Sequence, residues 1–88
     1  MQVKDLTLDE HIVVKNIINY EENIERFRQA QIILLSWLEE SVPEIARWID
    51  YEEKAVARVI RDFNDQGVTY LDPYQAYNFQ DFVMFDEN

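Results

Sequence analysis

Apolar residues recur every three to four positions along most of this chain, which is the spacing of one face of a helix. One glycine and two prolines among 88 residues leave little of the turn chemistry that a sheet with tight hairpins requires. The pattern therefore predicts an all-α fold, a small bundle of four helices joined by short turns. We expect the helices at about residues 8–19, 21–39, 42–50 and 52–66.

Three local signals define where these helices begin and end. Thr7 with Glu10, and Ser41 with Glu44, have the spacing of a capping box, in which a hydroxyl and a carboxylate each accept a hydrogen bond from the backbone of the first turn. Pro43 falls in the first turn of the third helix, where its missing N–H costs nothing. Gly67 suits a backbone that turns left-handed at the end of the fourth helix.

The spacing also predicts which faces are buried. The second helix is expected to be the central core helix, with its stripe widened by neighbouring apolar side chains. The predicted core positions are Ile12, Val13, Ile17 and Ile18 in the first helix, and Ile24, Phe27, Ala30, Ile33, Leu34, Trp37 and Leu38 in the second.

Residues 41–67 carry the most specific pattern. A small residue, Ala46, lies between Ile45 and Ile49, and an apolar stripe follows in the next helix at the spacing that lets two short helices cross closely. The stripe consists of Val56, Val59, Ile60 and Phe63. These features predict a helix-turn-helix whose second helix presents Glu53, Lys54, Ala57, Arg58 and Arg61 on its outer side, with Lys54, Arg58 and Arg61 as a basic stripe.

Four stretches, 6–10, 26–36, 41–47 and 56–67, together resemble the N-terminal region of mariner-like bacterial insertion-sequence transposases. They occur in the same order and register, and the similarity covers about residues 6–73. In that family the region is a homeodomain-like domain that binds the terminal inverted repeats of the element. The resemblance implies double-stranded DNA as partner and a recognition helix at about 52–66. It assigns Lys54 and Arg58 to the groove and Arg47 and Arg61 to phosphates.

The chain departs from that family at several positions. Asp50 replaces a turn glycine, Glu52 replaces a serine or threonine cap, and Ala55 and Ala57 stand where polar or basic residues are frequent. After residue 73 the family continues with a basic linker and a catalytic domain, whereas residues 74–88 here are acidic and aromatic. We therefore divide the chain into a helix-turn-helix domain at 1–73 and a tail at 74–88, and expect no enzymatic activity.

The net charge of the chain argues against the DNA binding that the motif predicts. Eight basic and 18 acidic residues give a net charge of −10, whereas DNA-binding domains are usually basic. The basic stripe is alternatively an ordinary solvated face, paired with Glu53, Asp62 and Asp65. The alternative function is an acidic protein-interaction module, a DNA mimic or inhibitor that binds a basic protein surface. A decayed transposon fragment without a function is a third reading.

The sequence gives little support for a metal site, a cofactor site or a membrane segment. His11 is the single histidine and has no second metal ligand nearby, cysteine is absent, and Asp86-Glu87 alone cannot build a two-metal centre, so we expect no metal and no cofactor. Neither an apolar run of about 20 residues nor a signal peptide is evident, which favours a cytoplasmic protein without membrane contact.

Two aromatic features indicate possible contact surfaces. Trp48 lies on a short helix where we expect partial exposure, while core filling accounts for Trp37. The tail has aromatic residues at 74, 77, 79, 82 and 85. We expect it to fold back over the helical core; docking on a partner, or a homodimer formed through the tail or Trp48, is the alternative.

Overall fold

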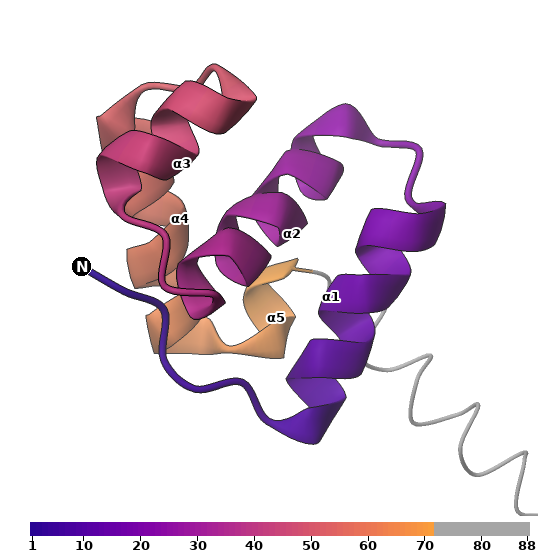
Figure 1. The fold of residues 1–88 in the computed structure, drawn as a ribbon. Coiled ribbons are helices and arrows are strands. Elements are labelled where there is room, and N and C mark those ends of the chain that lie inside the picture. The colour runs from indigo at the N-terminus through magenta and orange to yellow at the C-terminus, as the bar shows by residue number, and fades with distance from the viewer. Residues whose placement is uncertain (72–88) are drawn as a thin grey trace, which may run out of the picture.

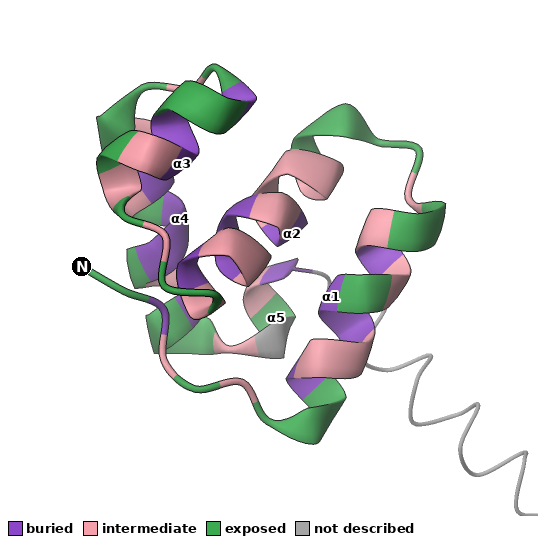
Figure 2. Cartoon of the chain, in the orientation of Figure 1, coloured by how far each residue is buried: buried purple, intermediate pink, exposed green. Residues whose placement is uncertain are grey.

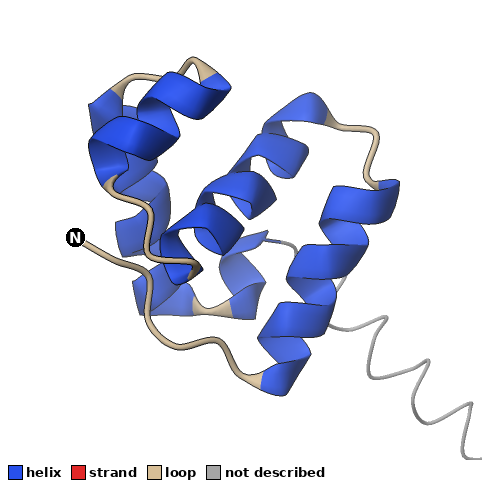
Figure 3. Cartoon of the chain, viewed as in Figure 1, coloured by secondary structure: helices blue, strands red, loops and turns tan. Residues whose placement is uncertain are grey.

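The computed structural model describes residues 1–71, and helices account for most of them (Figure 3). No strand occurs within these residues, so the described part of the chain is all-α as predicted. The tail and its predicted contacts lie outside the described residues. The helices are α1 (Leu8–Tyr20), α2 (Ile24–Trp37), α3 (Val42–Ile49), α4 (Glu53–Gln66) and the short α5 (Val68–Leu71), which the sequence pattern did not predict.

The predicted helix ends at Thr7, Ser41 and Gly67 are confirmed, whereas α2 is shorter than the predicted 21–39. The Thr7 hydroxyl accepts from the Glu10 N–H at 3.1 Å, and the Glu10 carboxylate accepts from the Thr7 N–H at 3.0 Å, which completes the capping box of α1. The Ser41 hydroxyl accepts from the Glu44 N–H at 3.3 Å and so caps α3. The second half of the predicted capping box is not formed, because the Glu44 carboxylate binds Arg47 instead of the Ser41 N–H. Gly67 ends α4 with φ +66° and ψ −146°, a backbone conformation that residues with a Cβ atom rarely adopt.

The helix α2 lies at the centre of the described fold (Figure 1). In that view α1 and α3 flank it on either side, α4 lies behind α3, and α5 lies behind the lower end of α2. The core is formed by Val3, Val13, Val14, Ile17, Ala30, Ile32, Ile33, Ile45, Ala46, Ile49, Val56, Val59, Ile60, Phe63 and Leu71. Figure 2 shows these buried positions on the sides of the helices that face one another.

The predicted packing of α3 against α4 is present in the structure. Ala46 is buried beside Ile45 and Ile49, and the whole predicted stripe of α4 is buried, with Val56, Ile60 and Phe63 fully inaccessible. Full burial of each such side chain stabilises the fold by roughly 1.5–3 kcal/mol. This packing fixes which side of α4 faces the core and, therefore, which side faces solvent.

The predicted core faces of α1 and α2 need correction. In α1, Val13 and Ile17 are buried as expected, but Val14 is buried as well, while Ile12 and Ile18 are only half-buried. In α2, Ala30 and Ile33 are buried as predicted, and the other core positions are Ile32 and Ser36. The prediction was wrong for Ile24 and Leu38, which are 64% and 55% exposed, and only partly right for the half-buried Phe27, Leu34 and Trp37.

The physical reason is that α2 carries apolar residues on several sides, interleaved with polar ones. When both sides of a helix carry large aliphatic residues, spacing alone cannot tell which side meets the core. The choice is made by the neighbouring helices. Ser36 illustrates this, because its fully buried hydroxyl accepts a hydrogen bond from the N–H of Val3 at 2.8 Å.

The N-terminal segment closes one end of the fold. Lys4 donates its N–H to the Asn64 Oδ1 at 2.7 Å, and the Asn64 amide donates to the Gln2 carbonyl at 3.1 Å. The Lys4 ammonium also contacts both oxygens of Glu10, at 2.7 and 2.8 Å. Burial raises the pKa of the Glu10 carboxyl, but Lys4 and the hydrogen bonds from Thr7 lower it by more, so the net pKa lies below its ordinary value. These contacts tie the segment before α1 to the end of α4.

Candidate nucleic-acid interface

The outward face of α4 carries the predicted basic stripe. Because Val56, Ile60 and Phe63 point into the core, residues half a turn away from them face solvent. Lys54, Arg58 and Arg61 occupy that side and are exposed. Their spacing of four and three residues places them in one row along the helix. The local fold therefore brings these three predicted site residues together on one surface.

The acids that the sequence offered as partners for this stripe do not pair with it. Within residues 1–71, no carboxylate lies within ion-pair distance of Lys54, Arg58 or Arg61. The three basic groups are thus unneutralised by direct contact in the described part of the chain. Of the two other predicted site residues on this helix, Glu53 is exposed in the first turn and Ala57 is half-buried.

Arg47 lies in the last turn of α3 and is exposed, but its charge is partly compensated. Its Nη2 lies 2.5 and 2.6 Å from the two carboxylate oxygens of Glu44, one turn earlier on the same helix. Both side chains are solvent-accessible, so the pair contributes little to stability and can be exchanged for another anion. A role for Arg47 at a phosphate therefore requires it to leave Glu44.

A shallow hollow separates α3 from the beginning of α4. Arg47 and Lys54 line it together with three acids, Asp50, Glu52 and Glu53. Asp50 adopts the left-handed conformation, with φ 62° and ψ 48°, a conformation that favours glycine. Glu52 is the N-cap residue of α4 but makes no side-chain capping hydrogen bond. The turn thus places acidic groups beside the end of α4 that would otherwise attract anions.

The sequence pattern missed Tyr70 as a neighbour of the basic stripe. Burial, followed by the carboxylates of Asp62 and Glu25, raises the pKa of Tyr70 above its ordinary value, and the Arg58 guanidinium lowers it in part. Arg58 is therefore close enough to influence the phenol of Tyr70 on α5. No signal in the sequence predicted this, because α5 itself was not predicted.

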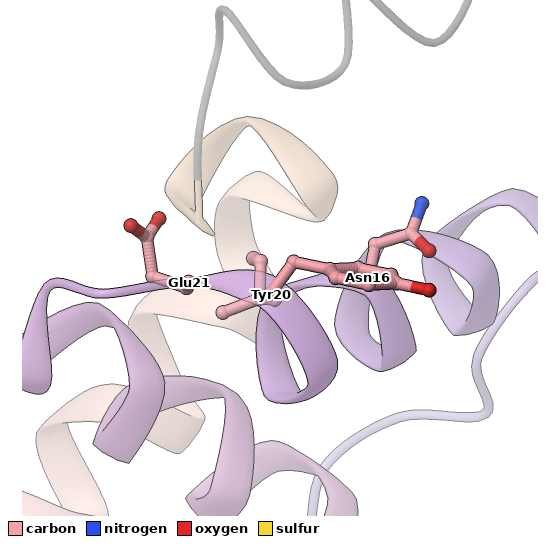
Figure 4. A pocket seen from close by; sticks show the side chains of 4 residues that line it. Asn16, Tyr20 and Glu21 are labelled. Atoms are coloured by element: carbon pink, nitrogen blue, oxygen red, sulfur yellow. The ribbon is translucent and has the colours of Figure 1, made fainter.

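No group of three or more histidine, cysteine, aspartate and glutamate side chains within residues 1–71 is arranged so that it could hold a metal ion. His11 is half-buried and packs edge-on against Trp37, with ring centroids 5.0 Å apart. A hollow at the end of α1 is lined by Asn16, Ile17, Tyr20 and Glu21 (Figure 4). In that view the Glu21 carboxylate and the Asn16 amide point away from each other.

Each described helix is too short or too polar to traverse a lipid bilayer.

No protein-family model, curated protein or solved structure matches the chain in the comparisons with known proteins. The resemblance to transposase DNA-binding regions therefore rests on the residues of this sequence alone.

Proposed function

We propose that the chain is a homeodomain-like helix-turn-helix protein that binds double-stranded DNA through the outward face of α4. The observation that carries this proposal is the exposed row of Lys54, Arg58 and Arg61, which lies opposite the buried stripe and has no acidic partner among the described residues. The order of the sequence stretches shared with transposase DNA-binding regions supports it.

The dimensions of α4 suit this role. At 1.5 Å per residue, Lys54 and Arg61 are separated by about 10 Å along the helix axis, which is comparable to the roughly 12 Å width of the major groove. In this arrangement Lys54 and Arg58 reach base edges, and Arg61 contacts phosphate. Arg47 reaches the backbone from α3 once it releases Glu44. Glu53 and Ala57, on the neighbouring turns of α4, complete the contact surface.

Two features limit the affinity. The N-terminal segment, which in homeodomains enters the minor groove, is held here by Ser36 and Asn64. The carboxylates of Asp50 and Glu52 lie beside the start of α4 and repel phosphate. We therefore expect weak binding, because few cations replace counterions, and we expect the binding to weaken further as the salt concentration rises.

A salt titration by fluorescence anisotropy tests the proposal, with duplexes of random and inverted-repeat sequence. With phosphate contacts from Arg61 and Arg47, the logarithm of the binding constant should fall with a slope of about 2 against the logarithm of salt concentration. Lys54→Ala and Arg58→Ala should each weaken binding, whereas Lys15→Ala, which removes an exposed cation from α1, should not. Equal binding by all four proteins at low salt would refute a role for α4.

The second candidate is an acidic protein-interaction module that binds a basic protein surface. The observation that favours it is the cluster of Asp50, Glu52 and Glu53 in the hollow beside Lys54, in a chain of net charge −10. If no duplex binds at about 50 mM salt, where modest basic patches show affinity, this function replaces the first. Binding to a basic protein should then weaken when Glu52 and Glu53 are both changed to glutamine.

A further inference from the structure

The outward face of α2 is apolar although it faces solvent. A groove runs along it between α1 and α3, and its apolar lining comes from all three helices. The lining residues are Ile18, Arg28, Gln31, Leu34, Leu35, Trp48 and Ile49. Trp48 is 70% exposed although its ring is the largest apolar surface at this site. Figure 2 shows this side of α2 largely as half-buried rather than buried surface.

This groove contains one residue of the predicted core stripe of α2. Leu34 was expected in the core, but it faces the groove, and the neighbouring Leu35 also lines it. A helix that is apolar on both sides is typical of one that is covered on both sides. On one side α4 and α5 supply that cover, whereas the described residues supply none over the groove. The sequence of α2 therefore indicates a further packing element.

We infer that the aromatic segment at 74–88 of the same chain docks in this groove. Its composition fits, because it supplies Tyr74, Tyr77, Phe79, Phe82 and Phe85 and contains no lysine or arginine. Aromatic side chains that lie in an apolar groove bury large areas with few conformations to lose. Its acids, Asp81, Asp86 and Glu87, can approach Arg28, the cation on the groove's lining.

The chain can reach the groove from where the described residues end. Leu71 is buried, and its carbonyl accepts a hydrogen bond from the guanidinium of Arg26 on α2. The helix that lines the groove thus also anchors the start of the segment. The 17 residues at 72–88 span up to about 56 Å when extended and about 25 Å as a helix. Both lengths exceed the roughly 10 Å diameter of one helix, so the segment is long enough to cross from one side of a neighbouring helix to the other.

Charge favours docking within one chain over pairing of two copies. Each copy carries a net charge of −10, so two copies repel each other at long range. A segment that already belongs to the chain avoids the cost of bringing two molecules together and acts at a high effective concentration. The inference does not depend on whether α4 binds DNA, because the groove lies on the opposite side of α2.

The fluorescence of Trp48 in the full chain tests this inference. Trp37→Phe leaves Trp48 as the single tryptophan and conserves the ring beside His11. With the segment docked, the emission of Trp48 should be shifted to the blue and shielded from the neutral quencher acrylamide. Changing Phe79, Phe82 and Phe85 together to alanine should shift the emission to the red and raise the quenching constant at least twofold. Changing Gln75, Asn78 and Gln80 to alanine is the matched control and should have no effect.

Cysteine pairs identify the occupant, because the chain has no cysteine of its own. Gln31→Cys with Asp81→Cys should oxidise to an intramolecular disulfide at least tenfold faster than Arg61→Cys with Asp81→Cys, which places the first thiol on the far side of α4. A red-shifted Trp48 that the phenylalanine changes do not affect would refute docking. Disulfide-linked dimers, or quenching that changes with protein concentration, would assign the groove to a second copy and also overturn the inference. None of these measurements involves DNA.

Discussion

The helices α2 and α4 have the same length, 14 residues, but distribute their side chains in opposite ways. In α4 the four buried residues lie on one side and the cations Lys54, Arg58 and Arg61 on the other. In α2 large apolar side chains occupy both sides, and Ile24 and Leu38 remain exposed. The helix α4 therefore has one way to face the core, whereas α2 has at least two.

This difference explains where sequence reasoning succeeded. A polar face tells which side of a helix is outside, so the buried stripe of α4 and the exposure of its basic row followed from spacing alone. In α2 polar and apolar residues are interleaved around the helix, and its orientation depends on where α1, α3, α4 and α5 pack. An apolar stripe thus predicts that a surface will be covered, but not by which element.

The largest effect on stability is expected when a residue on the inner side of α4 is compared with a residue on the outer side of α2. Phe63→Ala should lower the free energy of unfolding by about 3–5 kcal/mol, because a fully buried ring is lost and a cavity remains. Ile24→Ala should lower it by less than about 0.5 kcal/mol, because that side chain is 64% exposed. Urea denaturation of both variants measures the difference. Similar losses would mean that the outer side of α2 is as buried as the core.

A second change examines how α4 ends. Gly67→Ala should cost roughly 2–3 kcal/mol, because alanine does not readily adopt this backbone conformation. The added Cβ would also lie 2.9 Å from the Glu10 Oε2, which Lys4 holds in place. Thermal unfolding of Gly67→Ala in the native and Glu10→Ala backgrounds separates the two causes. If the cost disappears with Glu10→Ala, the contact with the carboxylate dominates; a cost below about 0.5 kcal/mol in both backgrounds would contradict the prediction.

The smallest effects on stability are expected from glycine substitutions in the turn after α2 and in the turn before α4. Glu39 and Asp50 both have a positive φ, of 74° and 62°, so a change to glycine relieves strain at either site. Each variant should gain up to about 1 kcal/mol in stability. Only Asp50→Gly also removes a carboxylate from the hollow beside Lys54, so only it should tighten DNA binding, by roughly twofold to fivefold at low salt. Equal affinities would show that the acid at this turn does not oppose DNA.

Sequence reasoning recovered the four long helices because their ends carry local signals. The capping residues Thr7 and Ser41, and the terminating Gly67, act within a few positions of themselves. The bonds of Asn64 to the N-terminal segment escaped prediction, because they join residues about 60 positions apart and depend on the completed packing. The row of cations on α4 was predicted because it follows from spacing within one helix, while the influence of Arg58 on Tyr70 was not, because α5 itself was not predicted.

The attachment of the first residues to the last turn of α4 has a consequence for the order of folding. Lys4 and Asn64 are 60 residues apart, so forming this contact closes a long loop, whereas α3 and α4 meet through neighbours in the chain. On the ribosome, the amide of Lys4 is synthesised early but must wait for Asn64 to emerge before it finds its partner. The beginning of the chain is therefore among the last parts to become fixed, and exchange of its amide protons reports when the domain is complete.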